Sequence, residues 1–250
     1  MAALDKGVAR IRRKHKNLKV DESMKAVFGS DKASLIRFVN SAFGKSHDPE
    51  RAAFRTHPTE YVFGDLRKVY SDLVFSIGDE RYHIEFQTQF DSSMVIRIFE
   101  YSLTDALRAY RDMPCGDLHF EISRPLVIQV EEHPDSKDTL SISVGVSGLP
   151  ERFAFEVPVV QVWRFSVEDL VTRDWYLLLP FCLLRYRAAA ASGHAGEYAA
   201  FVEMYHAVVK ALDALVDGGT FGRDVRDALQ QALDYCWTTA SRIRGIPREG

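Results

Sequence analysis

The sequence predicts an α/β protein with a helical C-terminal region, and three observations favour this class. Residues 69–89 alternate apolar and polar side chains on both sides of a Gly-Asp turn, which is typical of a β-hairpin. Residues 125–130 form a nearly continuous apolar run, as expected of a buried strand. From Val167 onward the apolar residues recur at the spacing of amphipathic helices.

Composition and charge describe an ordinary globular protein with an uneven charge distribution. The 250 residues are 46% hydrophobic and 27% charged, enough for one large domain or for one domain with a helical extension. Residues 1–19 hold seven Lys or Arg and one Asp, a net +6 that leaves −9 for the rest of the chain. This basic arm is compatible with contacts to a phosphate backbone, and equally with a solvated tail.

Cysteine usage and hydropathy favour a soluble protein of a reducing compartment, the cytoplasm. Cys115, Cys182 and Cys236 are far apart and form no CxxC pair, so a zinc knuckle or a disulfide framework is not expected. The basic N-terminus lacks the apolar segment of a signal peptide. The longest apolar run, residues 175–184, contains Pro180 and is shorter than the roughly 20 residues of a membrane helix.

The first part of the chain predicts helices before the hairpin. Asp21-Glu22-Ser23 is typical of a helix start, and residues 32–43 carry an apolar stripe followed by a capping Gly44. The polar residues 45–58 predict a loop, and residues 60–63 predict a short strand.

The hairpin brings acidic residues together in either of two registers. A turn at Gly78-Asp79 places Asp72 opposite Glu85, whereas a turn at Asp79-Glu80 places it opposite Gln87. In both registers the three polar side chains share one face, close enough for the carboxylates to bind one divalent cation. The alternative is a solvated face of an antiparallel sheet, where such residues are common.

Helices and strands alternate after the hairpin, and helices follow to the end. Residues 94–111 predict a helix whose apolar side includes Ile98, Tyr101, Leu103 and Leu107. The buried strand 125–130 follows. Residues 140–146 and 153–162 predict two more strands, and residues 197–216 and 221–244 predict two helices with apolar stripes suited to core packing.

These motifs, in this order, resemble the PD-(D/E)XK nuclease core, and more closely its recombination-promoting nuclease and transposase branch. The matching stretches are DESMKAVFG, LIRFVNSAFG, SDLVF with Asp72, IEFQ with Glu85 and Gln87, MVIRIFEY with Arg97 and Tyr101, and RPLVIQV. The resemblance covers residues 21–130 in order and extends more loosely to about residue 185. It implies a mixed sheet flanked by helices and the hydrolysis of DNA phosphodiesters.

The resemblance also implies roles for particular residues. Asp72 and Glu85 would bind Mg²⁺ or Mn²⁺ together with the backbone carbonyl of Phe86. The superfamily pattern has Lys at the position of Gln87, and glutamine carries no positive charge. The branch commonly has ExQ, so Gln87 is kept as a catalytic candidate. Arg97 and Tyr101 lie four residues apart on one helical face, where they either contact substrate or serve packing.

Three further polar residues near the hairpin are weaker candidates. Glu60 could add a carboxylate and His83 could act as a base, but a surface role is favoured for Glu60 and a hydrogen-bonded or solvated role for His83. Gln89 either extends the site or faces water. We divide the chain into a basic arm (residues 1–20), a nuclease-like core (21–175) and a helical region (176–250).

The leading hypothesis is a DNA endonuclease, with two alternatives. One is a degenerate nuclease fold kept as a DNA- or protein-binding module. The other is a structural protein that self-associates through its C-terminal helices.

Overall fold

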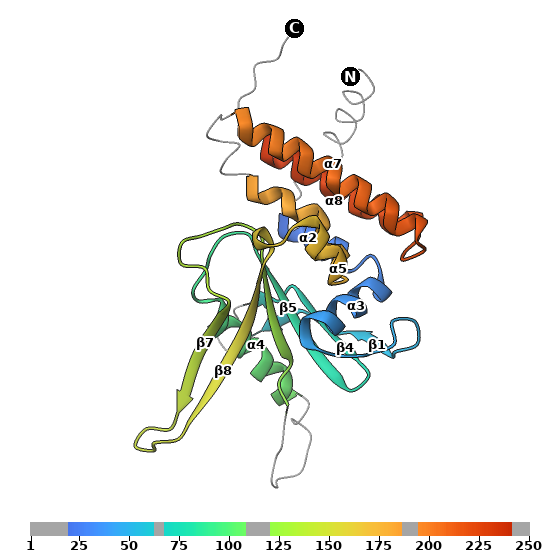
Figure 1. Ribbon diagram of the computed structural model, residues 1–250. Helices are drawn as coiled ribbons and strands as arrows, with labels where there is room; N and C mark the ends of the chain where they lie inside the picture. Colours follow the sequence, from blue (N-terminus) through green and yellow to red (C-terminus); the bar gives the residue numbers. More distant parts are fainter. Residues whose placement is uncertain (1–19, 63–67, 109–120, 187–194, 242–250) are drawn as a thin grey trace. The chain divides into compact units, whose positions relative to one another are not determined.

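The computed structural model describes residues 20–62, 68–108, 121–186 and 195–241 (Figure 1). The chain divides into two compact units. The helical unit comprises residues 1–50, 130–132 and 162–250, and the sheet unit comprises residues 51–129 and 133–161. The basic arm, residues 1–19, lies outside the described residues.

A six-stranded mixed sheet forms the sheet unit, which confirms the predicted α/β class. Its strands, in spatial order, are β1 (Phe54–Thr56), β4 (Leu73–Ile77), β5 (Glu80–Gln87), β6 (Arg124–Gln129), β8 (Arg152–Gln161) and β7 (Thr139–Gly145). Strands β5, β6 and β8 are parallel neighbours, and the other pairings are antiparallel. The three predicted strands after the hairpin match β6, β7 and β8 within one residue at either end.

The β4–β5 hairpin adopts the first of the two predicted registers. Ile77 pairs with Glu80 across a two-residue turn, and Gly78 has a φ of +58°, a value that a residue with a Cβ rarely adopts. Leu73 pairs with Ile84, so the next step of the ladder sets Asp72 opposite Glu85.

Three short strands lie before the hairpin. The prediction of a loop over residues 45–58 is wrong at β1, which pairs with β4 and brings Phe54 against Phe75 at a ring-centroid distance of 5.4 Å. The predicted strand at residues 60–63 is confirmed as β2 (Glu60–Val62), and residue 63 lies outside the described residues. It pairs with β3 (Lys68–Tyr70) in a separate two-stranded sheet.

Helix α4 (Met94–Arg108) packs on one face of the main sheet. Met94, Val95 and Ile98 form an apolar cluster with sheet residues Val127, Leu140, Phe155 and Val157. Leu107 was predicted on the apolar side but is 47% exposed, because the apolar contacts of α4 are concentrated in its first half. The predicted last turn of this helix, residues 109–111, lies outside the described residues.

Helices from both ends of the chain build the helical unit. They are α2 (Val20–Phe28), α3 (Lys32–Phe43), α5 (Val167–Thr172), α7 (Ala195–Asp217) and α8 (Arg223–Ser241), with 3-10 segments η1 (Val162–Arg164) and η2 (Tyr176–Arg185). The bounds of α3 are those predicted: Asp31 caps its start by accepting from Ser34 N at 2.8 Å, and Gly44 ends it with a φ of 63°.

The apolar run at residues 176–184 is the centre of the helical unit. It forms most of η2, every residue of it is buried, and both α3 and α8 pack against η2. The predicted boundary between residues 175 and 176 therefore falls inside this unit, just before η2.

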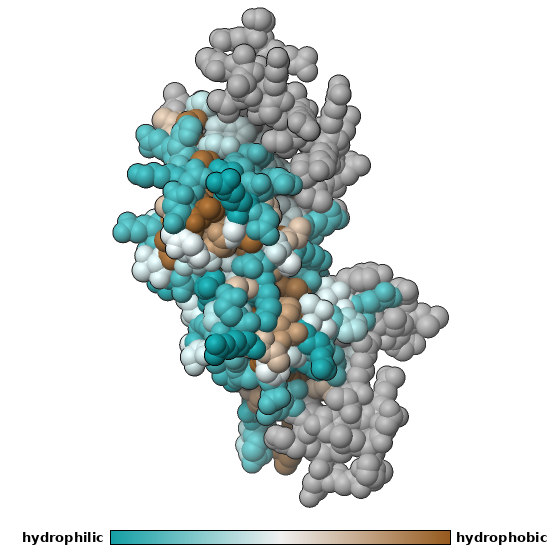
Figure 2. All heavy atoms as spheres, turned by 90° about the vertical axis from the view of Figure 1, so that its right-hand side faces the viewer, coloured by the Kyte–Doolittle hydropathy of each residue, from teal (hydrophilic) through white to brown (hydrophobic). Residues whose placement is uncertain are grey.

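Among the described residues, no helix has the length and apolar character needed to cross a membrane. Hydrophilic side chains predominate on the face shown in Figure 2, where apolar side chains occur in small patches.

Candidate functional site

Asp72 and Glu85 face each other across the start of the hairpin. The Asp72 N–H donates to Glu85 Oε1 at 3.2 Å, and the Phe86 N–H donates to Asp72 Oδ2 at 2.8 Å. Each carboxylate therefore accepts a hydrogen bond from the backbone of the opposite strand. This reciprocal arrangement fixes the Asp72 side chain just before the start of β4 and the Glu85 side chain on β5, in the first of the two predicted registers.

The polar face of β5 is buried, so the alternative of a solvated face is wrong. Glu85 and Gln87 are each 5% exposed, and His83 is 1% exposed. The cause is α4, whose residues pack against Val127, the neighbour of Glu85 in the parallel β5–β6 pair. Buried carboxyl and imidazole groups need hydrogen-bond partners to offset lost hydration, and these residues have them.

His83 connects Glu85 to Ser71 within this buried face. Its Nε2 lies 2.7 Å from Glu85 Oε1 and 2.8 Å from Ser71 Oγ. A serine-hydrolase triad places the acid and the serine on opposite ring nitrogens, whereas here both contacts are made by Nε2. The three residues therefore act as a hydrogen-bonded support for Glu85 and not as a nucleophile system.

Gln87 and Arg97 both contact Asp91, in the loop between β5 and α4. Gln87 Nε2 donates to the Asp91 carbonyl at 3.3 Å, and Arg97 forms an ion pair with Asp91 Oδ2 at 2.9 Å. Hydrogen bonds from the Ser93 hydroxyl and N–H, with the charge of Arg97, hold the pKa of Asp91 below its usual value despite partial burial. The loop thus joins two of the predicted site residues.

Tyr101 lies on the same face but is only 2% exposed, and its ring centroid is 6.0 Å from that of His83. In this structure it covers the histidine. Glu60 lies on β2, in the separate small sheet, and its cross-strand partner is Tyr70.

Two glutamines that the sequence reasoning missed extend the polar face. Gln87, Gln129 and Gln161 are neighbours in register on three parallel strands, and all are at most 5% exposed. Gln129 Nε2 donates to Ser136 Oγ at 2.9 Å, and Gln161 Nε2 donates to Asp138 Oδ1 at 3.0 Å. The available signal was a glutamine ending each of the apolar runs PLVIQ and VPVVQ.

The donor set at the hairpin fits a hard divalent cation. Both described hydrogen bonds to the Glu85 carboxylate end on Oε1, which leaves Oε2 available as a ligand. The N–H and C=O of one strand residue point to the same neighbour, so the Phe86 carbonyl points toward the side on which its N–H meets Asp72. Two carboxylates and a carbonyl are ligands that Mg²⁺ accepts, with water and phosphate at its remaining positions.

Clusters of three or more His, Cys, Asp or Glu residues suited to a metal ion do not occur among the described residues. A cation at the hairpin would therefore rely on backbone and solvent oxygens beyond the two carboxylates.

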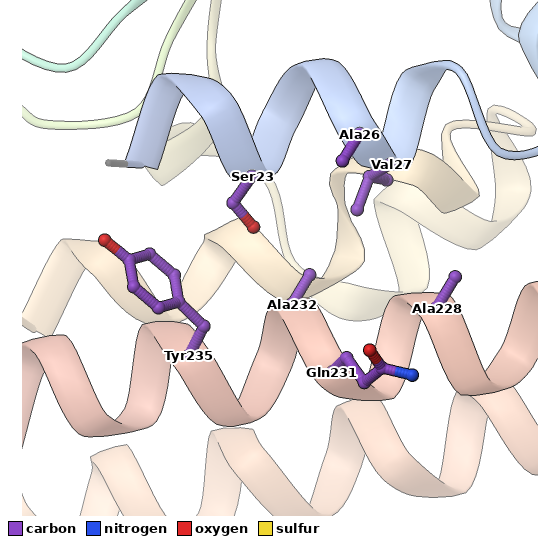
Figure 3. A pocket seen from close by; sticks show the side chains of 7 residues that line it. All are labelled: Ser23, Ala26, Val27, Ala228, Gln231, Ala232 and Tyr235. Atoms are coloured by element: carbon purple, nitrogen blue, oxygen red, sulfur yellow. The ribbon is translucent and has the colours of Figure 1, made fainter. Parts of the chain in front are cut away.

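A hollow in the helical unit lacks the acidic and basic side chains typical of a catalytic or metal site. It has a volume of about 130 Å³ and lies between α2 and α8. Figure 3 shows its lining, which is made of Ser23, Ala26, Val27, Ala228, Gln231, Ala232 and Tyr235. It contains neither a carboxylate nor an imidazole, so the hairpin remains the stronger candidate.

No family model, curated protein or solved structure matches this chain. The geometry of the hairpin and the motif resemblance are therefore the observations that bear on the function of this chain.

Proposed function

We propose that this protein is a metal-dependent DNA endonuclease of the transposase- and recombination-associated type, with a PD-(D/E)XK core. The observation that supports this proposal best is the opposition of Asp72 and Glu85 across β4 and β5, next to Phe86 and beneath α4. Two carboxylates, each held by a backbone N–H of the opposite strand, form a preorganised set of oxygen ligands, which is the main requirement for metal-assisted hydrolysis of a phosphodiester.

The proposed cofactor is Mg²⁺ or Mn²⁺, held by Asp72, Glu85 and the Phe86 carbonyl. When bound, such an ion lowers the pKa of a coordinated water and offsets the charge that develops on the phosphate. His83 holds Glu85 Oε1 in position through its Nε2, and Ser71 in turn contacts that same nitrogen. Tyr101 and α4 keep water away from the histidine.

Gln87 and Arg97 would act on the substrate side. The Gln87 amide orients a water molecule or a phosphate oxygen, and Arg97 supplies the positive charge that Gln87 lacks. Both now contact Asp91, and the Arg97 side chain is 42% exposed. A substrate phosphate would therefore compete with the Asp91 carboxylate for the guanidinium.

The same contacts favour the second candidate, a degenerate nuclease fold that binds DNA or protein without cleaving it. Gln87 replaces the usual lysine, and the only acid near Arg97 that the described contacts show, Asp91, already neutralises it. The net charge of −3 also gives the whole chain little general affinity for DNA. A binding module would rely on the basic residues 1–19, and its affinity would fall steeply with salt.

Plasmid nicking with Mg²⁺ or Mn²⁺ tests the proposal. We expect Asp72→Asn and Glu85→Gln to reduce cleavage at least about 100-fold, because each removes an anionic ligand while preserving shape. Asp79→Asn, at an exposed carboxylate in the turn of the same hairpin, is the matched control and should cleave like wild type. EDTA should abolish cleavage by every variant.

The result that contradicts the proposal is absence of cleavage by wild type, or equal cleavage by wild type and both site variants. Wild type that binds DNA without cleaving it, and keeps that binding in Asp72→Asn, would establish the binding module instead.

The proposed setting is the cytoplasm, and the proposed partner is DNA. Cys182 is a buried free thiol, which suits a reducing compartment. Burial raises the pKa of the Cys182 thiol to about 12, so it stays protonated and unreactive at neutral pH.

A further inference from the structure

Strand β7 forms one edge of the main sheet. It pairs antiparallel with β8 over all seven of its residues, from Thr139 to Gly145, without a bulge. In the described part of the chain, no strand pairs with its other side. Figure 1 shows β7 at the outside of the sheet, next to β8.

This edge lacks the features that normally prevent strands from pairing between molecules. The β7 sequence TLSISVG contains no charged residue and no proline. Natural edge strands are usually interrupted by Lys, Pro, a bulge or an inward-pointing charge. A regular, uncharged edge of seven residues is therefore open to another strand.

The alternation of hydrogen-bonded and non-hydrogen-bonded pairs between β7 and β8 shows which backbone groups of β7 point toward the open edge. Val159 N donates to the Asp138 carbonyl at 2.9 Å, which makes residues 138 and 159 a hydrogen-bonded pair. Since such pairs alternate along an antiparallel ladder, residues 140, 142 and 144 also bond to β8. The N–H and C=O groups of residues 139, 141, 143 and 145 consequently point away from β8, toward the open edge.

We propose that two copies of this protein associate by pairing their β7 strands antiparallel about a two-fold axis at Ile142. This register sets Ser141 opposite Ser143 of the second copy, and Thr139 opposite Gly145. All four are residues whose backbone groups point outward, so the pairing forms about eight backbone hydrogen bonds. The two six-stranded sheets become one continuous sheet.

The side chains are self-complementary in the same register. Leu140 is buried, Ile142 is half-buried and Val144 is 40% exposed, all on the α4 side of the sheet. Pairing about Ile142 sets Val144 opposite Leu140 of the second copy and Ile142 opposite its own counterpart. The serines meet on the other face, where neither copy carries a charge within the strand to repel the other.

This interface is independent of the proposed nuclease activity and differs from the C-terminal helices. The pairing depends only on the outward-pointing backbone groups, the uncharged edge and the apolar row of β7. A dimer built by strand addition gains its affinity mainly from main-chain hydrogen bonds, and its alternating side chains set the register.

Charge placement on the edge tests the pairing. Ser141 and Ser143 are exposed, so substitutions there should leave the monomer fold intact. The double variant Ser141→Lys/Ser143→Lys places lysines opposite each other twice in the interface. The matched variant Ser141→Lys/Ser143→Glu places each lysine opposite a glutamate of the second copy. Sedimentation equilibrium measures the molecular mass in solution, which is compared with 28.4 kDa for a single chain. Circular dichroism checks that each variant keeps its fold.

We expect wild type and the Lys/Glu variant to be dimers and the Lys/Lys variant to be a monomer with an unchanged spectrum. Three outcomes overturn the proposal. Wild type could remain a monomer up to about 100 μM, a concentration beyond most specific associations. The dimer could persist in the Lys/Lys variant, which would place the contact elsewhere, for example on the helices. The Lys/Glu variant could fail to dimerise, which would exclude the two-fold register at Ile142.

Discussion

The helical unit and the sheet unit bury different chemistry. Of the ten buried polar residues described, the helical unit holds two, Ser23 and Ser34. The sheet unit holds the other eight: Ser71, His83, Glu85, Gln87, Ser102, Ser123, Gln129 and Gln161. Every buried carboxylate, imidazole and side-chain amide described is therefore in the sheet unit.

This difference distinguishes a unit whose interior serves packing from a unit whose interior also holds the candidate site. Removing acids and amides from water is unfavourable unless each finds a partner, and apolar residues of similar size would pack as well or better. The helical unit follows that simpler rule, with stacked aromatic rings such as Phe201 and Trp237 at 4.4 Å. The polar face of β5 departs from it, as sites of chemistry commonly do.

The largest effect on stability is expected in the aromatic core of the helical unit. Phe201 is 2% exposed and stacks on Trp237 at a ring-centroid distance of 4.4 Å, so Phe201→Ala should lower the free energy of unfolding by about 3–5 kcal/mol. Tyr198→Ala, at a ring 39% exposed on the same helix as Phe201, is the control and should change it far less. Urea titrations followed by circular dichroism measure both. A small loss of stability for Phe201→Ala would mean that this unit does not depend on its apolar core.

A smaller effect is expected in the buried polar network of the sheet unit. His83→Ala leaves Glu85 Oε1 and Ser71 Oγ without their shared partner, and should lower the free energy of unfolding by about 1–3 kcal/mol. His206→Ala, at an exposed histidine of α7, is the matched control. Equal urea midpoints for the two variants would show that the network adds nothing to stability, and the contrast between the units would weaken.

In the helical unit, we expect polar side chains to contribute to stability mainly at helix ends. Asp31→Ala removes the cap on the Ser34 N–H and should lower the free energy of unfolding by about 1 kcal/mol. Asp31→Asn keeps an acceptor at the same place and should stay near wild type. If Asp31→Ala and Asp31→Asn lower thermal stability equally, the charge of Asp31, and not its hydrogen bond with the Ser34 N–H, is what stabilises α3.

The smallest expected effect is on the pH dependence of stability. Burial, then the positive charge of Arg81, lowers the pKa of His57 below 6.5, and the charge of Asp105 partly opposes this. The unfolded chain therefore binds more protons than the folded one as the pH falls. This contribution to stability is complete above pH 6.5 and is lost as the pH falls through the folded-state pKa. His57→Gln, which can still bond Ser76 Oγ, should show a shallower loss of melting temperature between about pH 7.5 and 5. An identical slope would exclude His57 as a contributor.

Local signals explain which elements the sequence predicted well. Helix α3 has the predicted bounds because its cap residues, Asp31 and Gly44, are adjacent to it in sequence. The hairpin register follows from a period of two and from one glycine able to adopt a positive φ. The opposition of Asp72 and Glu85 was therefore among the predicted registers before any long-range contact was known.

Non-local contacts explain the rest. Strand β1 has only three residues and exists through its pairing with β4, which polar residues 45–58 do not reveal. Gln129 and Gln161 join Gln87 only because three parallel strands align, about 40 and 70 residues further along the chain. The burial of Glu85 depends on where α4 packs, and its sequence alone does not fix that position.

The discontinuity of the helical unit has a consequence for synthesis on the ribosome. Helix α2 packs against α8, yet the whole sheet unit and much of the helical unit are translated between them. At ordinary elongation rates, α2 waits about 10 to 40 s for its partner. The sheet unit is contiguous apart from residues 130–132, so it can fold during that interval. Helix α2 is thus translated early and buried late, and chaperones that bind apolar helices have a long opportunity there.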